Sequence, residues 1–431
     1  MKDDYLIVFG DRSEYHSNDV ITTYIEGFQS AEAQKRHTKI IKSLSQGYLD
    51  QMINSLSEAD FSSLSKENKE LLEKLVDGIT SNNGRAIVGL TFLQLTVKSI
   101  APEQNIRLHK SSTSKGKFSW TDGISMRTID KSFVTPFLRE HNLIKLNADG
   151  IFMTRTLAEN YPYTKLYKAK IQGPFRECLD IMDALENESM PAEIALKYFT
   201  VLLKNKSDEF KEIAKTAIKY EEEFDGTTFE VVQSVLEDFF NSTHYSARAY
   251  EIVMHGFMQA MGELGYIGDS ELIPLSQMRN ANKKHGNIGD IELKTDGIIT
   301  ESWDAKYGKP YLREELEELR EKILESPGVQ LAGFVADSTI DKRKDVVERI
   351  EEIEFETDVE ILLLTFKEWL DFQLRRKMFV DKTKLGYRWL CAVVESFAQE
   401  RREYAPIDEP CDEWLKDLTE CMKNHLAVEE V

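Results

Sequence analysis

Two aspartates and one lysine in the third quarter of the chain have the types and spacing of a divalent-cation site. Asp290 is separated from Asp304 by 13 residues, and Lys306 follows two positions later. Carboxylate oxygens suit Mg²⁺, which usually keeps waters and phosphate oxygens in its other coordination positions. A cation held in this way activates water and bridges phosphate oxygens, so the chemistry that this pattern indicates is phosphodiester hydrolysis.

Two short β-strands are expected to position these residues, over residues 289–293 and 300–307. Asp296-Gly297 between apolar-rich runs is a strong signal for a hairpin turn. The two-residue period of a strand places Asp304 and Lys306 on one face of the hairpin. A solvated hairpin with ordinary surface charges is the alternative interpretation of the motif by itself.

The register of the hairpin decides whether the two carboxylates can meet. A strict two-residue turn at Asp296-Gly297 would place Asp290 and Asp304 on opposite faces. Because one cation site needs both on the same face, the sequence predicts an odd-numbered loop or a β-bulge between Leu293 and Thr300.

The segments around the hairpin have recognisable periodicities. Residues 246–264 carry an apolar stripe at helical spacing and include Glu251. Residues 311–325 predict a charged helix, and residues 329–335 and 359–364 predict buried strands. The order is therefore helix, hairpin, helix, strand.

This order and the Asp290, Asp304 and Lys306 pattern resemble the PD-(D/E)xK nuclease superfamily, over roughly residues 245–370. Gly289 stands where that family often has proline. The resemblance implies an α/β (α+β) fold with a restriction-endonuclease-like αβββαβ core. It also implies a Mg²⁺-dependent DNA endonuclease.

The resemblance assigns roles to individual residues. Asp290 and Asp304 would bind the metal, with the backbone carbonyl of Ala305 as a third ligand, and Lys306 would orient or help deprotonate the attacking water. Glu251 would complete the acidic cluster; its alternative interpretation is a carboxylate favoured near a helix N-terminus by the helix dipole. Two further candidates are weaker, namely Glu292, which shares a strand face with Asp290, and Lys309 as a contact for a neighbouring phosphate.

Within that superfamily, the chain is most like a type II restriction enzyme that has a separate recognition domain. The resemblance then implies double-stranded DNA as substrate, a homodimer with one active site per strand, and a companion DNA methyltransferase. Two other interpretations stay open: a modification- or structure-dependent nuclease of the same fold, and a non-catalytic DNA-binding regulator.

A basic segment lies in an otherwise acidic chain. Residues 85–170 hold 14 Lys and Arg against 6 Asp and Glu, a balance of +8, whereas the whole chain carries −20 and the remainder therefore −28. Such asymmetry fits a nucleic-acid-binding module on an acidic scaffold. A helix over residues 125–139 that contains Pro136, followed by a hairpin over residues 143–154, resembles a winged-helix module.

Candidate DNA contacts in this segment are basic residues on the predicted helix and on the polar loop before it. Arg127 and Lys131 lie one turn apart on the helix, and the loop contributes Arg107, Lys115 and Lys117. A small α+β domain with a solvated basic face is the alternative interpretation.

Length and composition set the remaining expectations. The 431 residues, 41% apolar and 30% charged, are typical of a multidomain soluble protein. No apolar run is long enough for a membrane span, and the first residues do not resemble a signal peptide, so we expect a cytoplasmic, intracellular protein. The four cysteines show no metal-binding or disulfide spacing.

The expected organisation has five segments. They are a helical N-terminal region (1–83), the winged-helix-like module (84–170), a helical connector (171–245), the nuclease core (246–370) and a helical C-terminal extension (371–431).

Overall fold

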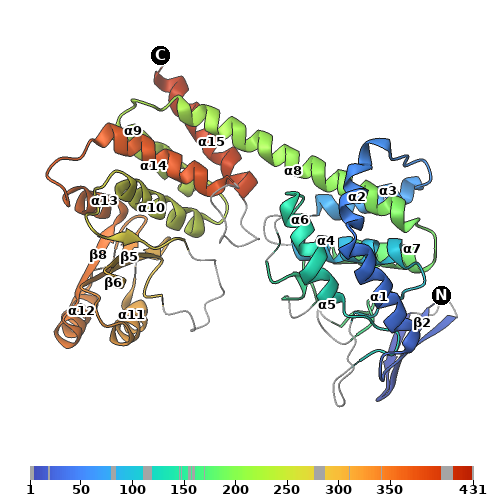
Figure 1. Ribbon diagram of the computed structural model, residues 1–431. Coiled ribbons are helices and arrows are strands. Elements are labelled where there is room, and N and C mark those ends of the chain that lie inside the picture. Colours follow the sequence, from blue (N-terminus) through green and yellow to red (C-terminus); the bar gives the residue numbers. More distant parts are fainter. Residues whose placement is uncertain are drawn as a thin grey trace. The chain divides into compact units, whose positions relative to one another are not determined.

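The computed structural model describes most of the chain, namely residues 4–17, 20–78, 84–109, 119–144, 146, 148–153, 157, 161–168, 170–275, 287–309, 311–340, 342–398 and 411–429. The chain divides into two compact units, Met1–Phe210 with Ile407–Pro410 and Lys211–Pro406 with Cys411–Val431. Figure 1 labels helices and strands of both units where there is room. The protein is a mixed α/β protein.

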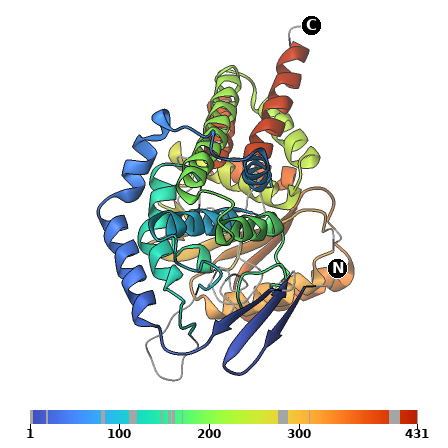
Figure 2. The ribbon, with the colours of Figure 1, turned by 90° about the vertical axis from the view of Figure 1, so that its right-hand side faces the viewer.

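The first unit begins with a three-stranded antiparallel sheet in the order β1-β2-β3, drawn in dark blue in Figures 1 and 2. Its strands are β1 (Tyr5–Val8), β2 (Arg12–Ser17) and β3 (Val20–Ile25). The region expected to be helical over residues 1–83 thus begins with a sheet, and its helices follow from Ala31. Alternating aromatic and β-branched residues favour strands, and Tyr15 and Tyr24 on one face pack against the buried Trp120.

The rest of the first unit is helical. Its helices are α1 (Ala31–Ser45), α2 (Tyr48–Asn54), α3 (Lys66–Asp77), α4 (Arg85–Ile100), α5 (Met126–Ile129), α6 (Thr135–Glu140), α7 (Phe175–Glu186) and the beginning of α8 (Ala192–Glu222). Short 3₁₀ turns at Leu56–Glu58 and Ile151–Met153 complete the element list, together with a π-helical turn at Asp130–Val134.

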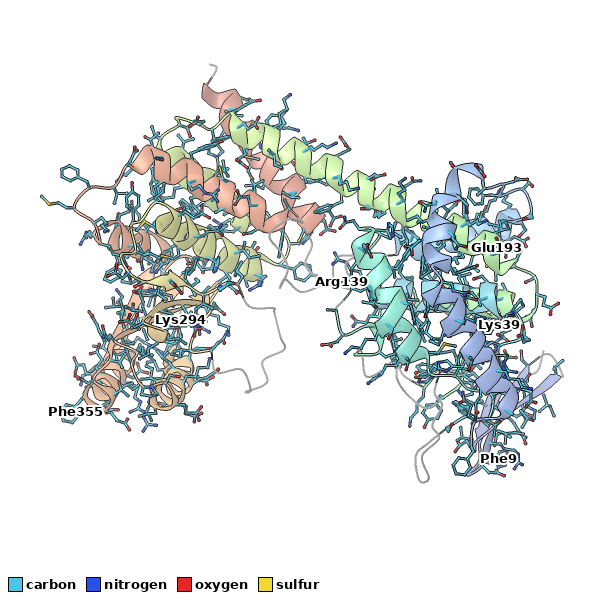
Figure 3. All side chains as sticks on the ribbon, viewed as in Figure 1. Phe9, Lys39, Arg139, Glu193, Lys294 and Phe355 are labelled. Atoms are coloured by element: carbon cyan, nitrogen blue, oxygen red, sulfur yellow. The ribbon has the colours of Figure 1, made fainter. Side chains whose placement is uncertain are left out.

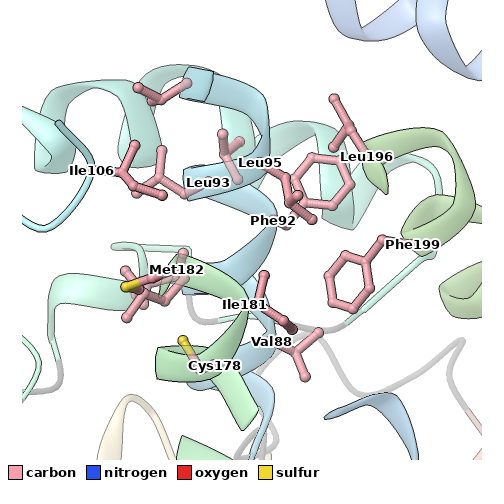
Figure 4. Packing of buried hydrophobic residues seen from close by; sticks show 14 of the residues in the cluster. Val88, Phe92, Leu93, Leu95, Ile106, Cys178, Ile181, Met182, Leu196 and Phe199 are labelled. Atoms are coloured by element: carbon pink, nitrogen blue, oxygen red, sulfur yellow. The ribbon is translucent and has the colours of Figure 1, made fainter. Parts of the chain in front are cut away.

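Helix α4 lies at the centre of the first unit. Apolar side chains occur on all of its sides, and 13 of its 16 residues are buried. Figure 4 shows Val88 and Phe92 of α4 beside Ile181 of α7 and Phe199 of α8. Because one core runs from Ala33 to Leu203, residues 84–170 contribute to a larger packed unit and do not form a module with a separate core.

The second unit is built on a five-stranded mixed sheet in the order β4-β5-β6-β7-β8. β4, β5 and β6 pair antiparallel, whereas β6, β7 and β8 pair parallel. The strands are β4 (Glu271–Leu272), β5 (Ile291–Thr295), β6 (Ile298–Lys306), β7 (Leu331–Ala336) and β8 (Glu360–Thr365).

Helices cover both faces of this sheet. One face packs against α10 (Ser246–Glu263) and α13 (Phe366–Leu374), where the rings of Trp303 and Trp369 are in contact. The opposite face packs against α11 (Arg313–Glu325) and α12 (Lys344–Thr357), through a cluster that includes Phe334. Helices α9 (Phe229–Ser242) and α14 (Lys382–Phe397) pack against α10, and α15 (Cys411–Glu429) packs against α9 and α14.

None of the helices in the described ranges combines the length and the apolar content that a bilayer crossing requires.

Candidate active site

The hairpin formed by β5 and β6 contains the β-bulge that the sequence predicts. Asp296 and Gly297 have positive φ angles of 54° and 79°, as a type I′ turn requires, and Thr295 pairs with Ile298. The register then shifts by one, since Leu293 pairs with Glu301 and Thr300 is skipped in the pairing with β5. The prediction of a bulge between Leu293 and Thr300 is therefore confirmed.

The bulge brings Asp290 and Asp304 together. The Asp290 backbone N–H donates to the Trp303 carbonyl at 2.9 Å, and its carboxylate accepts from the Ala305 N–H at 3.0 Å. Both carboxylates therefore face the same side of the sheet and lie close enough for each to affect the pKa of the other. This is the geometry that one shared cation site requires of two carboxylates.

The electrostatics of this pair favour a cation. Burial raises the pKa of Asp304 well above its usual range, and the charge of Asp290 raises it further. Burial also raises the pKa of Asp290, and so does the charge of Glu251 on α10. Two adjacent carboxylates with little access to water repel each other, and a divalent cation between them would remove that repulsion.

Lys306 lies next to the pair and carries a firm positive charge. Its ammonium is 3.0 Å from an Asp304 oxygen and 2.9 Å from a Glu315 oxygen, with the side chain 13% exposed. Burial lowers the pKa of Lys306, but Asp304 and Glu315 outweigh it and raise the pKa above the usual value. The two carboxylates therefore favour the charged form of Lys306, which suits it to orient a neighbouring group.

Glu315 is a site residue that the sequence did not indicate. It lies in the first turn of α11 and contacts both Lys306 and the exposed Lys309, the latter at 3.2 Å. Its sequence environment is a run of glutamates that is typical of a solvated helix face. Only the crossing of α11 over the end of β6 distinguishes it from Glu314.

Glu251 reaches the edge of the site but has another partner. It forms an ion pair with the buried Arg248 one turn earlier on α10. Over the described ranges, no three His, Cys, Asp or Glu side chains lie close enough together to bind one metal ion. Mg²⁺ is commonly held by one or two carboxylates with waters and phosphate oxygens, so the donor set of Asp290 and Asp304 fits Mg²⁺ without Glu251.

Glu292 and Gly289 determine the position of the Asp290 backbone, and we assign neither of them a direct role in binding the cation. The buried Glu292 carboxylate accepts the Ile288 N–H at 2.6 Å and the Gly289 N–H at 3.4 Å, which fixes the chain before Asp290. A Cβ on Gly289 would lie 2.7 Å from the Trp303 carbonyl oxygen. Glycine, which has no Cβ, therefore allows the two strands to approach closely beside Asp290.

The candidate DNA contacts in the first unit have different environments. Arg107 is 7% exposed, donates to the Tyr163 carbonyl at 2.9 Å and pairs with Asp183 at 2.6 Å, so the expectation that it contacts DNA is wrong. Its guanidinium instead connects Tyr163 and Asp183 inside the first unit. Lys115 and Lys117 lie outside the described residues.

Arg127 and Lys131 are both exposed, as expected for a binding surface. Arg127 donates to the Phe152 carbonyl at 2.7 Å, and Lys131 pairs with the exposed Asp149 at 3.2 Å. Their helix continues through Pro136, because the π-helical turn before it accommodates the missing N–H.

The hairpin expected over residues 143–154 is wrong for its described part. Residues 148–150 form a turn and Ile151–Met153 form a 3₁₀ helix, while Lys145, Asn147 and Thr154 lie outside the described residues. The buried Asp130 carboxylate accepts the Ile151 N–H at 2.7 Å, a donor that a strand ladder would have used. The hydrogen bond between Ile151 and the distant Asp130 is thus found where the expected β-hairpin would have had a strand pairing.

Comparisons with known proteins do not assign this chain to a family. Neither a protein-family model nor a curated protein sequence matches this chain.

Proposed function

We propose that the protein is a Mg²⁺-dependent endonuclease that hydrolyses phosphodiester bonds in double-stranded DNA. The observation that carries this proposal is the bulged hairpin, which holds the carboxylates of Asp290 and Asp304 together with the Lys306 ammonium beside them. Paired carboxylates with a fixed cation suit a negatively charged substrate that brings a metal ion into the site.

The arrangement of elements in the second unit supports the same proposal. Helix α10 precedes three antiparallel strands, β4 to β6, and α11 then leads to β7, which is parallel to β6. This succession is similar to the αβββαβ core of PD-(D/E)xK nucleases. Here Asp290 directly precedes the second strand, Asp304 lies on the third, and Lys306 follows two residues after Asp304, as in the motif of that superfamily.

The residues have separable tasks in the proposed reaction. Asp290 and Asp304 would hold Mg²⁺, with the Ala305 carbonyl as a further ligand, and the bound ion would supply an activated water and neutralise phosphate charge. Lys306 would hold that water in line and offset charge developing on the phosphate. Glu315 fixes the Lys306 ammonium from the opposite side.

A type II restriction enzyme is the form of this activity that we propose, acting as a homodimer beside a companion methyltransferase. Sequence recognition would then fall to another surface, and the exposed Arg127 and Lys131 are candidates for it. An enzyme of this kind cuts unmodified DNA at fixed positions.

Incubation of the purified protein with unmodified plasmid DNA and Mg²⁺, followed by sequencing of the fragment ends, tests the proposal. Fragments with a common end sequence support a restriction enzyme. Cleavage confined to methylated or branched DNA supports instead a modification- or structure-dependent nuclease. If all of these substrates stay intact while the protein binds them, the nuclease proposal is wrong and the non-catalytic regulator replaces it.

A further inference from the structure

The connection between α13 and α14 exposes two large apolar side chains. Met378 is 94% exposed and Phe379 is 85% exposed. The connection projects from the second unit in Figure 1, away from the helices that it joins. Side chains of this size are normally buried, and an adjacent pair in open solvent is typical of an interaction site.

Both ends of this connection are anchored. The Arg376 guanidinium forms an ion pair with the buried Glu301 of β6 and bonds Gln373 on α13. At the other end, Asp381 caps α14 by accepting the Lys384 N–H at 3.1 Å, and its own N–H donates to the Tyr266 hydroxyl at 3.2 Å. The apolar pair is therefore held outward by fixed neighbours and is not part of a fraying end.

The surroundings of the pair are positively charged. Residues 375–384 contain five Lys and Arg and one Asp, in a chain with a net charge of −20. Arg375, Lys377 and Lys384 are exposed, and in the part of the chain that the structure describes they form no ion pair. Unpaired cations beside an apolar tip are complementary to a polyanion that also has apolar surface.

A nucleic acid duplex has both properties. Its phosphates attract Lys and Arg, and proteins that bend DNA insert apolar side chains between base steps from the minor groove. We propose that Arg375, Lys377, Met378, Phe379 and Lys384, here called the basic wedge, form a second contact with the DNA duplex. The three cations bind phosphates, and Phe379 and Met378 enter the groove. This inference rests on the proposed function and adds a binding surface to it.

The anchor gives this contact a positional role. Glu301 lies three residues before Asp304 on β6, about 10 Å along the strand. Because Arg376 is tied to that strand, a duplex held by the basic wedge is held in a fixed relation to the strand that carries the carboxylates. The wedge would thus stabilise one register of the DNA on the second unit.

Two variants of the full-length protein separate the two parts of the wedge. Met378→Ser with Phe379→Ser removes the apolar tip, and Arg375→Ser with Lys377→Ser and Lys384→Ser removes the charges. Phe355→Ser with Lys344→Ser is the matched control, since Phe355 is equally exposed at 94% but lies on α12 among glutamates and points outward in Figure 3. All replaced side chains are exposed, so folding should be kept, and thermal melting checks it.

Binding is measured by fluorescence anisotropy with duplex DNA in Ca²⁺ over a range of salt concentrations. Removal of the three cations should reduce the steepness of the logarithmic salt dependence by about one unit for each phosphate that they bind. Removal of the tip should weaken binding about tenfold or more with the salt dependence unchanged, as when a stacking aromatic is removed. The tip variant should also abolish a fluorescence increase from 2-aminopurine in the duplex, and the control variant should match the wild type.

Failure of the wedge and failure of the nuclease proposal give different results. Wild-type cleavage together with unaltered DNA binding by both wedge variants overturns the wedge and leaves the nuclease. Absence of duplex binding by the wild type overturns both. Wedge-dependent sedimentation with phosphatidylserine-containing vesicles, without any effect of the variants on DNA binding, assigns the surface to an anionic membrane and also overturns the inference.

Discussion

At the scale of single residues, the decisive feature is a pair of carboxylates that have few other partners. Burial raises the pKa of both Asp290 and Asp304, and the charge of Asp290 raises that of Asp304 further. Lys306 balances part of this charge from one side. Negative charge on the two carboxylates is thus only partly compensated, and this favours the binding of a divalent cation.

Asp304→Ala should reduce cleavage by several orders of magnitude, about the decrease expected when a metal and its activated water are removed. DNA affinity should be kept or increased in the absence of metal, since a carboxylate that repels phosphate is gone. Cleavage in Mg²⁺, binding in Ca²⁺ and a melting curve measure the three effects. Asp296→Asn is the matched control, because asparagine tolerates the positive φ of this turn position. Normal cutting by folded Asp304→Ala protein would contradict the assignment.

Lys306 and Glu315 should differ in the size of their effects. Lys306→Ala removes the fixed charge, and we expect kcat to fall roughly a hundredfold to a thousandfold, as when one electrostatic stabiliser is removed. Glu315→Gln removes only the ion pair that fixes the Lys306 ammonium, so we expect kcat to decrease roughly tenfold. Both should leave metal binding nearly intact, measured by calorimetry. A rise in KM with kcat unchanged for Glu315→Gln would show that it does not position Lys306.

His255 predicts a pH dependence of stability that does not involve the carboxylates. Burial lowers the pKa of His255 to about 4 from its ordinary 6.5, against the opposing effect of its 3.0 Å hydrogen bond to the Ile273 carbonyl. The other ring nitrogen, Nδ1, has no partner in the part of the chain that the structure describes. Protonation would place a buried N–H where nothing accepts it.

Because the folded pKa is depressed for a base, the unfolded chain binds the proton first as the pH falls. The stability from neutral His255 is complete above pH 6.5 and is lost progressively down to about pH 4. His255→Gln keeps a donor for Ile273, so it should flatten this decline, by at most about 3 kcal/mol. Urea unfolding at several pH values measures it, and identical slopes in both proteins would show that His255 is not the cause.

At the scale of elements, the hairpin and the helix that follows it determine the arrangement of the charged groups. The two-residue turn and the bulge at Thr300 set the register, while Glu292 fixes the residues that enter β5. α11 then brings Glu315 to the end of β6. The chemistry of the site depends on strand register more than on any one contact.

Gly289→Ala should disturb this element. The new Cβ would lie 2.6 Å from the Ser302 hydroxyl and 2.7 Å from the Trp303 carbonyl oxygen, so the strands must separate next to Asp290. We expect roughly 1–3 kcal/mol of destabilisation and a marked decrease in cleavage. Gly10→Ala, where a Cβ meets nothing within 4 Å, is the control. Unfolding and cleavage assays measure both, and wild-type values for Gly289→Ala would show that the close approach is unimportant.

At the scale of the whole molecule, charge is distributed unevenly over an acidic chain. The exposed Arg127 and Lys131 belong to the basic segment of the first unit, and the basic wedge belongs to the second. Each surface is locally positive although the net charge is −20. Local potential and not net charge governs contact with phosphates.

Arg127→Ala with Lys131→Ala should weaken DNA binding and reduce the salt slope by about one unit for each phosphate that these side chains bind. Thermal stability should change little, because both side chains are exposed and their partners are a carbonyl and a surface carboxylate. Anisotropy across salt concentrations measures this. Lys66→Ala, an exposed lysine on α3, is the control. Unchanged affinity at every salt concentration would place the recognition surface elsewhere.

The sequence by itself determined the local features of this protein. Hydrophobic periodicity identified the helix around Glu251 and strands of the second unit, because burial of one face repeats with the period of the element. The Asp-Gly turn and the need for one cation site together predicted the bulge, because side-chain direction alternates strictly along a strand.

Tertiary structure alone decided the contacts between distant residues. Glu315 meets Lys306 because α11 crosses the end of β6, and Arg107 is buried because Asp183 and Tyr163 enclose it. The wing was replaced by a turn because the Asp130 carboxylate, 21 residues away, takes the Ile151 N–H. Such contacts depend on how elements pack, and no periodicity or spacing within one segment encodes the partner that another segment supplies.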